Sequence, residues 1–137
     1  MIEKQTSPLR TKLQDGDVAY GIFSYSGNSE IIEAATTTGI DFIVLDMEAS
    51  PMSNRDVVTS LQGMNGSNCQ GIVRVPRHDI QLIGHALDVG AAGVMVPKVE
   101  TGNEAHTLGS AFRYPPLGTR GINSFRAQAY GAIEDRT

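Results

Sequence analysis

The feature that most constrains this chain is a strict alternation of short apolar runs and amphipathic stretches. The apolar runs lie at residues 19–24 ("AYGIFS"), 41–46 ("DFIVLD"), 71–75 ("GIVRV") and 93–97 ("GVMVP"). Amphipathic stretches at 28–39, 53–63 and 79–90 separate them, and each of these ends on a glycine. Apolar strands joined by helices predict a parallel sheet covered by helices, so the predicted fold class is α/β. The spacing does not choose between a barrel and an open, doubly wound sheet.

The length of the chain indicates one domain. It has 137 residues, of which 40% are hydrophobic, and this is enough to bury a core. We therefore expect a single domain over residues 1–137, in which residues 1–17 form a polar leader and a first helix. Two of the expected helices carry start signals, a capping Asn28 in the first and the capping spacing from Ser53 to Asp56 in the second.

Charge and cysteine content exclude several classes of function. The formal net charge is −4 and no cluster of Lys and Arg occurs, so a nucleic-acid partner is not expected. The longest apolar runs are far shorter than the roughly 20 residues that a membrane span needs. The first ten residues lack the apolar core of a signal peptide, so we expect a cytoplasmic protein. The single cysteine, Cys69, excludes a disulfide framework or a thiolate metal cluster within one chain.

Nucleotide-binding motifs are absent from the sequence. The segment "SYSGNSE" after the first strand has one glycine, where a dinucleotide-binding fingerprint has three. No "GKS" or "GKT" of a phosphate-binding loop occurs either.

Polar side chains follow the ends of the predicted strands, where α/β folds build their sites. They are Ser24, Asp46, Glu48, Arg74, Lys98 and Glu100. Lys98 and Glu100 are more simply explained as loop charges or helix caps. A carboxylate at a buried strand end needs a partner, and a guanidinium within an apolar run needs a fixed anion. The sequence therefore predicts a small-anion pocket where Arg74 faces the two acids.

Four motifs, in order, carry a resemblance to a known family: "GIDFIVLDME", "GIVRVP", "ALDVGAAGVMVPKVET" and "RYPPLGTRGI". In these the chain resembles the HpcH/HpaI aldolases, which are metal-dependent pyruvate aldolases that include 2-dehydro-3-deoxyglucarate aldolase. The likeness runs from about Ala19 to Gly131. It implies a (β/α) barrel of the TIM type and a reversible aldol reaction, in which a divalent metal, Mg or Mn, holds pyruvate as its enolate. It also implies an oligomer, commonly built from dimers.

The resemblance assigns roles to individual residues. Arg74 matches the arginine that binds pyruvate and stabilises the negative charge of the enolate. Asp46 and Glu48 match acids that organise water beside the metal, and Asp88 matches an acid that supports the catalytic dyad. Taken without the resemblance, Asp88 is a charge on a helix surface.

The resemblance also bears on residues that would shape the site. Ser24 and Pro97, with Arg74, are the residues we expect to bind the substrate. Arg113 and Arg120 flank "YPPLG", which matches the family signature and is expected to form a rigid turn because its two prolines forbid a helix.

Two departures from the family pattern bear on activity. Family members usually have a histidine, the general base, directly after the glutamate, whereas this chain has Ala49. His78 is a candidate substitute. The second departure is that the resemblance covers only the first half of the family, whose two metal-ligating acids would lie beyond Thr137. The chain thus carries about four of the eight strands of a barrel, so we expect a homo-oligomer or a second chain to complete it.

Two functional hypotheses follow. The first is a lyase that cleaves a 4-hydroxy-2-oxo acid to pyruvate and an aldehyde, with a site completed by another chain or by substitutes such as Glu100. The second is a non-catalytic relative that binds a small 2-oxo acid or serves in assembly, because the base position is Ala49 and metal ligands are missing.

Overall fold

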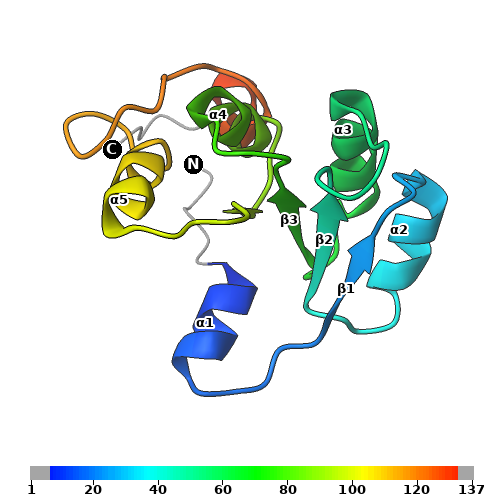
Figure 1. The fold of residues 1–137 in the computed structure, drawn as a ribbon. Coiled ribbons are helices and arrows are strands. Elements are labelled where there is room, and N and C mark those ends of the chain that lie inside the picture. Colours follow the sequence, from blue (N-terminus) through cyan, green and yellow to red (C-terminus); the bar gives the residue numbers. More distant parts are fainter. Residues whose placement is uncertain (1–6, 133–137) are drawn as a thin grey trace.

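The computed structural model describes residues 7–132, and these residues form one parallel sheet of four strands arranged in chain order (Figure 1). The strands are β1 (Gly21–Ser24), β2 (Phe42–Asp46), β3 (Gln70–Arg74) and β4 (Gly93–Met95). The helices are α1 (Pro8–Gln14), α2 (Ser29–Thr36), α3 (Asn54–Gly63), α4 (Ile80–Asp88) and α5 (Gly102–Ser110), followed by the short 3-10 element η1 (Arg126–Gly131). The predicted α/β class with four parallel strands is confirmed.

The pairing register assigns each strand residue to one of two faces, because residues paired side by side project to the same side of a sheet. Ile43 pairs with Gly71, and a Cβ atom added at Gly71 would collide with Leu61 of α3. This set of residues therefore faces the helices, on what we call the outer face. Val44, paired with Phe23 and Ile72, projects to the opposite side, which we call the inner face.

The hydrophobic core lies between the outer face and the helices. Figure 1 shows α2 and α3 together on one side of β1 and β2. Strand and helix residues meet there in a continuous buried cluster, whose most deeply buried members are Ile32, Ile43, Leu45, Val73, Val75 and Ile83. Ile43 and Leu45 of β2 belong to this cluster, and Val44 on the opposite face of the same strand is also buried, which explains why β2 is a continuous apolar run.

The helices start where the sequence predicts. The Asn28 side chain accepts hydrogen bonds from the backbone N–H groups of Glu30 and Ile31, which caps α2. Ser53 and Asp56 form a reciprocal capping box at the start of α3. Each cap satisfies N–H groups that have no partner within the helix.

Helix α1 is tied to the amino-terminal edge of the sheet. Lys12 Nζ lies 2.8 and 2.9 Å from the two carboxylate oxygens of Asp41, which directly precedes β2. The hydrogen bond from Lys12, with a second one from the Tyr20 backbone N–H, lowers the pKa of Asp41 below its ordinary value near 3.8. This pair anchors a helix that buries none of its own residues.

The segment after α5 forms the tight turn expected from "YPPLG". The backbone N–H groups of Leu117 and Gly118 donate to the Tyr114 carbonyl. A Cβ atom at position 118 would overlap the Arg113 carbonyl oxygen, so only glycine fits there. Within residues 7–132 no helix is long and apolar enough to cross a membrane.

Candidate active site at the carboxyl edge of the sheet

The buried Asp46 and the partly exposed Arg74 form an ion pair at the carboxyl ends of two neighbouring strands. They are the last residues of β2 and β3 and are paired in register, so their side chains leave the sheet on the same face. Arg74 Nη1 lies 3.1 Å from Asp46 Oδ2, and the Asp46 side chain is 0% exposed. The pairing of the acids with Arg74 that the sequence predicts is present in the structure.

The other oxygen of Asp46 shapes the turn that follows the strand. Asp46 Oδ1 accepts hydrogen bonds from the backbone N–H groups of Glu48 and Ala49, at 2.9 and 3.0 Å. This turn brings the Glu48 carboxylate back to Arg74, where Oε2 contacts Nη2. Two carboxylates therefore hold the two terminal nitrogens of one guanidinium, which fixes its plane.

Lys98 adds a second cation to the cluster. Its Nζ lies 3.6 Å from Glu48 Oε1, although the side chain is largely exposed. The backbone of Lys98 is left-handed, with φ of 56°, which is uncommon for a residue other than glycine. The sequence favoured a loop charge for Lys98, and no local pattern indicates the backbone conformation that puts it beside Glu48. The cluster thus contains two acids and two bases.

His78 joins two loops at the same edge. Its Nε2 lies 2.6 Å from the carbonyl oxygen of Pro97. Because a carbonyl oxygen only accepts, Nε2 is the donor, and Nδ1 is the nitrogen free to accept a proton when the ring is neutral. The contact connects the loop after β3 with the loop after β4. Pro97 takes part in it by accepting a hydrogen bond through its backbone carbonyl oxygen.

Among residues 7–132, neither Ser24 nor Asp88 forms a hydrogen bond or an ion pair with this cluster. Ser24 ends β1 and is buried, but it pairs with Leu45 and so lies on the outer face. Asp88 is the last residue of α4, and the first turn of this helix follows the loop that contains His78. The length of the nine-residue helix, about 13 Å, therefore separates Asp88 from the site.

The partners of Asp88 come from the segment after α5. Arg120 Nη2 donates to Asp88 Oδ1 at 2.8 Å, and the Asn123 amide donates to Oδ2. The Arg120 guanidinium also lies 4.8 Å from the centre of the Tyr114 ring. Asp88 therefore fastens the family-signature turn to α4.

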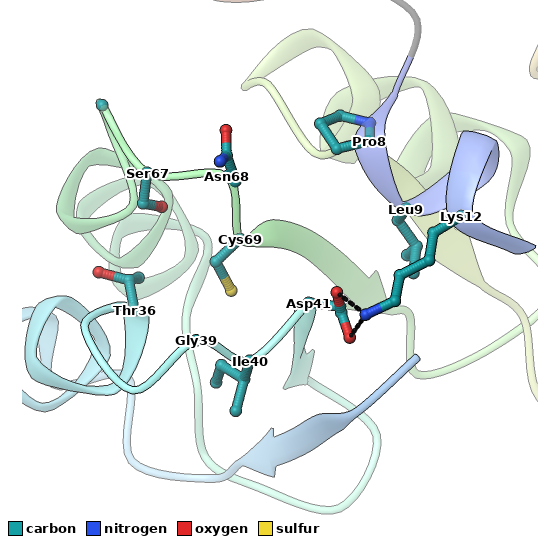
Figure 2. A pocket seen from close by; sticks show the side chains of 11 residues that line it. Pro8, Leu9, Lys12, Thr36, Gly39, Ile40, Asp41, Ser67, Asn68 and Cys69 are labelled. Atoms are coloured by element: carbon teal, nitrogen blue, oxygen red, sulfur yellow. Dashed lines mark hydrogen bonds and ion pairs between the residues drawn. The ribbon is translucent and has the colours of Figure 1, made fainter. Parts of the chain in front are cut away.

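A pocket lies at the opposite, amino-terminal edge of the sheet. It has a volume of about 590 Å³ and is lined by residues of α1 and of the loops that precede β2 and β3 (Figure 2). Its charged groups are Lys12 and Asp41, which neutralise each other. Burial raises the pKa of the Cys69 thiol above its ordinary value near 9.0, so the thiol stays protonated at neutral pH. In barrels of this kind the amino-terminal face serves stability.

Comparison with known proteins identifies the family. The model of the HpcH/HpaI aldolase/citrate lyase family matches residues 19–134. A 2-keto-3-deoxy-L-rhamnonate aldolase of Shigella boydii is 34% identical over 95% of this chain and 49% of its own length. A hydroxypyruvate/pyruvate aldolase of Chromohalobacter salexigens is 36% identical over 94% of this chain and 51% of its own length.

Solved structures agree with the family match. A crystal structure of an HpcH/HpaI aldolase/citrate lyase family protein from Burkholderia cenocepacia J2315 matches with a TM-score of 0.88 at 33% identity. That match covers 95% of this chain and 54% of the Burkholderia chain. The chain thus spans about half the length of the curated relatives it matches. It belongs to the HpcH/HpaI aldolase/citrate lyase family.

Proposed function

We propose that this chain supplies the part of an aldolase site that binds the 2-oxo acid. The reaction is the reversible aldol cleavage of a 4-hydroxy-2-oxo acid to pyruvate and an aldehyde, and the rest of the site would come from outside residues 7–132. The observation that carries this proposal is the Arg74 guanidinium, held between Asp46 and Glu48 at the carboxyl edge of the sheet. Relatives with the names of keto-acid and pyruvate aldolases support it.

Arg74 is suited to bind a 2-oxo acid. A guanidinium has five N–H donors, so its contacts with Asp46 and Glu48 leave others for a ligand. Its side chain is 28% exposed, so a ligand can reach it. When the carbon–carbon bond breaks, negative charge develops on the carbonyl oxygen of the pyruvate fragment. A donor already fixed by two carboxylates stabilises that charge without first reorganising.

A divalent metal, Mg or Mn, is expected from the family, and the described residues do not by themselves fit one. No group of three or more His, Cys, Asp or Glu side chains converges within residues 7–132. Asp46 and Glu48 already bind Arg74, and Glu48 also faces Lys98. Ligands for the metal would come from outside this part of the chain, and none of the roles assigned here depends on one.

Proton transfer is the step for which the described residues offer the fewest suitable side chains. At the expected base position, the side chain of Ala49 has no group that can take up a proton, and its backbone N–H donates to Asp46. Nδ1 of His78 is the alternative base at this edge.

The observation of Ala49 favours a second candidate function, a non-catalytic relative that binds a small 2-oxo acid or serves in assembly. A cytoplasmic location and a homo-oligomer stay predictions.

The test is pyruvate release from a 4-hydroxy-2-oxo acid by the purified chain, with Mg²⁺ or Mn²⁺ and then with a chelator. Restoring a base through Ala49→His is expected to raise the rate by about 100-fold, the lower end of general-base effects. Arg74→Ala is the matched control and is expected to abolish both release and pyruvate binding. Pyruvate binding in a calorimeter without release, even from Ala49→His, would overturn catalysis by this chain alone and leave the 2-oxo acid binding of the second candidate.

A further inference from the structure

Asn65 lies in an exposed turn after α3, and it is the only asparagine of the sequence that precedes a glycine. Gly66 is exposed as well, and a Cβ atom added to it would have no neighbour within 4 Å, so water reaches the peptide bond between the two residues. Within residues 7–132, the Gly66 backbone N–H forms no hydrogen bond. Because glycine has no Cβ atom, its backbone nitrogen can approach a neighbouring side chain closely.

The Asn65 side chain is held by a cation from a distant part of the chain. Arg126 Nη2 donates to Asn65 Oδ1 at 2.6 Å and to the Leu61 carbonyl oxygen at 2.9 Å. The Arg126 side chain passes over Gly90, where an added Cβ atom would lie 2.9 Å from Nε. The guanidinium therefore polarises the side-chain carbonyl of Asn65, which is the group that an attacking nitrogen would meet.

We propose that Asn65 is a site of spontaneous deamidation, and that Arg126 promotes the reaction and binds the carboxylate that it forms. The Gly66 backbone nitrogen gives its proton to hydroxide and bonds to Asn65 Cγ. The side-chain nitrogen takes up a proton and leaves as ammonia, so that a succinimide ring remains. Water then opens the ring at one of its two carbonyl groups, which gives aspartate or isoaspartate. Water is the co-reactant, and no group is oxidised or reduced.

Arg126 acts at two points of this reaction. Negative charge develops on Oδ1 when the nitrogen attacks, and a donor already in place stabilises that charge. In the product, the oxygen beside Arg126 belongs to a carboxylate, and a hydrogen bond between two charged groups is stronger than one to a neutral amide. The product makes the formal net charge of −4 more negative by one and joins the end of α3 to η1 by an ion pair. The inference does not depend on the proposed activity.

Two other asparagines serve as internal references. Asn28 and Asn123 each precede a serine, which is also a small residue. Their side-chain oxygens accept hydrogen bonds from backbone N–H groups, and among residues 7–132 neither oxygen accepts one from a guanidinium. Asn65 should therefore react before both of them.

Peptide mass spectrometry of the purified chain is the first test. After storage at slightly alkaline pH and physiological temperature, the peptide that contains Asn65 is expected to show the mass increase that exchanges an amide for an acid. It should show this before the peptides that contain Asn28 and Asn123. An unchanged Asn65 peptide, or earlier conversion at another asparagine, overturns the proposed site.

Arg126→Met tests the role of the guanidinium. It is expected to slow the conversion of Asn65 by about fivefold, which is less than the loss of a donor costs in a site that excludes water. The matched control is Arg55→Met, at an exposed arginine near the start of α3, and it should leave the rate unchanged. In urea, where the unfolded chain separates Arg126 from Asn65, the natural protein and Arg126→Met should react at equal rates. An equal or higher rate in Arg126→Met with native circular dichroism overturns promotion by Arg126.

Asn65→Asp reproduces one of the two products and tests the binding of the carboxylate. Arg126→Met is expected to lower the urea midpoint more in the Asn65→Asp protein than in the natural chain, because only the former loses an ion pair. Comparison of the four proteins separates this pair from the effect of a new negative charge at the end of α3. Equal losses in both backgrounds overturn the binding of the carboxylate by Arg126.

Discussion

The two edges of the sheet hold their charges in different ways. At the carboxyl edge, Asp46 is fully buried and shares Arg74 with Glu48, so one guanidinium satisfies two acids. At the amino edge, Asp41 meets one cation among residues 7–132, Lys12, in a pair that is partly open to water. The amino edge thus has a simple anchor for a helix, whereas the carboxyl edge has a charged group fixed in place with donors left over. A site for an anion needs the second arrangement.

The largest expected effect is the loss of stability when Asp46 is replaced, compared with the replacement of Asp41 at the other edge. Asp46→Ala leaves Arg74 without one partner and two backbone N–H groups unsatisfied. It should lower the free energy of unfolding by about 2–4 kcal/mol, less than for a fully buried pair because Arg74 is partly exposed. Urea denaturation measures this loss. Asp41→Ala is the matched change at the other edge and should cost clearly less.

Asp46→Asn sharpens the same comparison. The amide oxygen can still accept from the N–H groups of Glu48 and Ala49, so part of the stability should return, whereas the ion pair with Arg74 is lost. Equal losses for Asp46→Ala and Asp41→Ala would mean that the carboxyl edge has no special role in holding the fold.

A smaller effect is expected on ligand binding. Arg74→Lys keeps the charge but replaces the planar fork with a single ammonium, which cannot contact both acids and a ligand in the same geometry. Pyruvate affinity should fall by about tenfold, equivalent to about 1.4 kcal/mol, in isothermal titration calorimetry. Lys12→Met at the amino edge is the control and should leave the affinity unchanged. A loss in the control and none in Arg74→Lys would move the anion site to the other edge.

Local sequence patterns predicted the strands, the helix starts and the meeting of Asp46 with Arg74. That meeting follows from two strand ends at the same edge of a parallel sheet, and so it needs no knowledge of the packing. Lys98 was harder to place, because its position beside Glu48 depends on one left-handed backbone residue. The pairing of Asp88 with Arg120 was also not predicted, since it joins a helix end to an irregular segment 32 residues away.

The choice between barrel and open sheet lies beyond local patterns as well. Both architectures are built from the same apolar strands and the same helices, so a sequence of four strand–helix units does not distinguish a barrel from an open sheet. The likeness to barrel aldolases decides it, with the TM-score of 0.88 to the Burkholderia protein. The anchoring of α1 through Lys12 and Asp41 had no sequence signal, because the two residues are 29 positions apart.

The smallest effect is the pH dependence of the amino-edge pair. Because Lys12 lowers the pKa of Asp41 in the folded protein, the pair stabilises the fold above the ordinary carboxyl pKa near 3.8. That contribution is lost as the pH falls below this value and through the lowered pKa. Urea midpoints of the natural chain and of Lys12→Met should therefore differ slightly near pH 6 and converge below pH 4. Other carboxyls with lowered pKa values, such as Asp56, are present in both proteins and cancel. A difference that stays constant across this range would mean that Lys12 acts through the packing of its aliphatic chain.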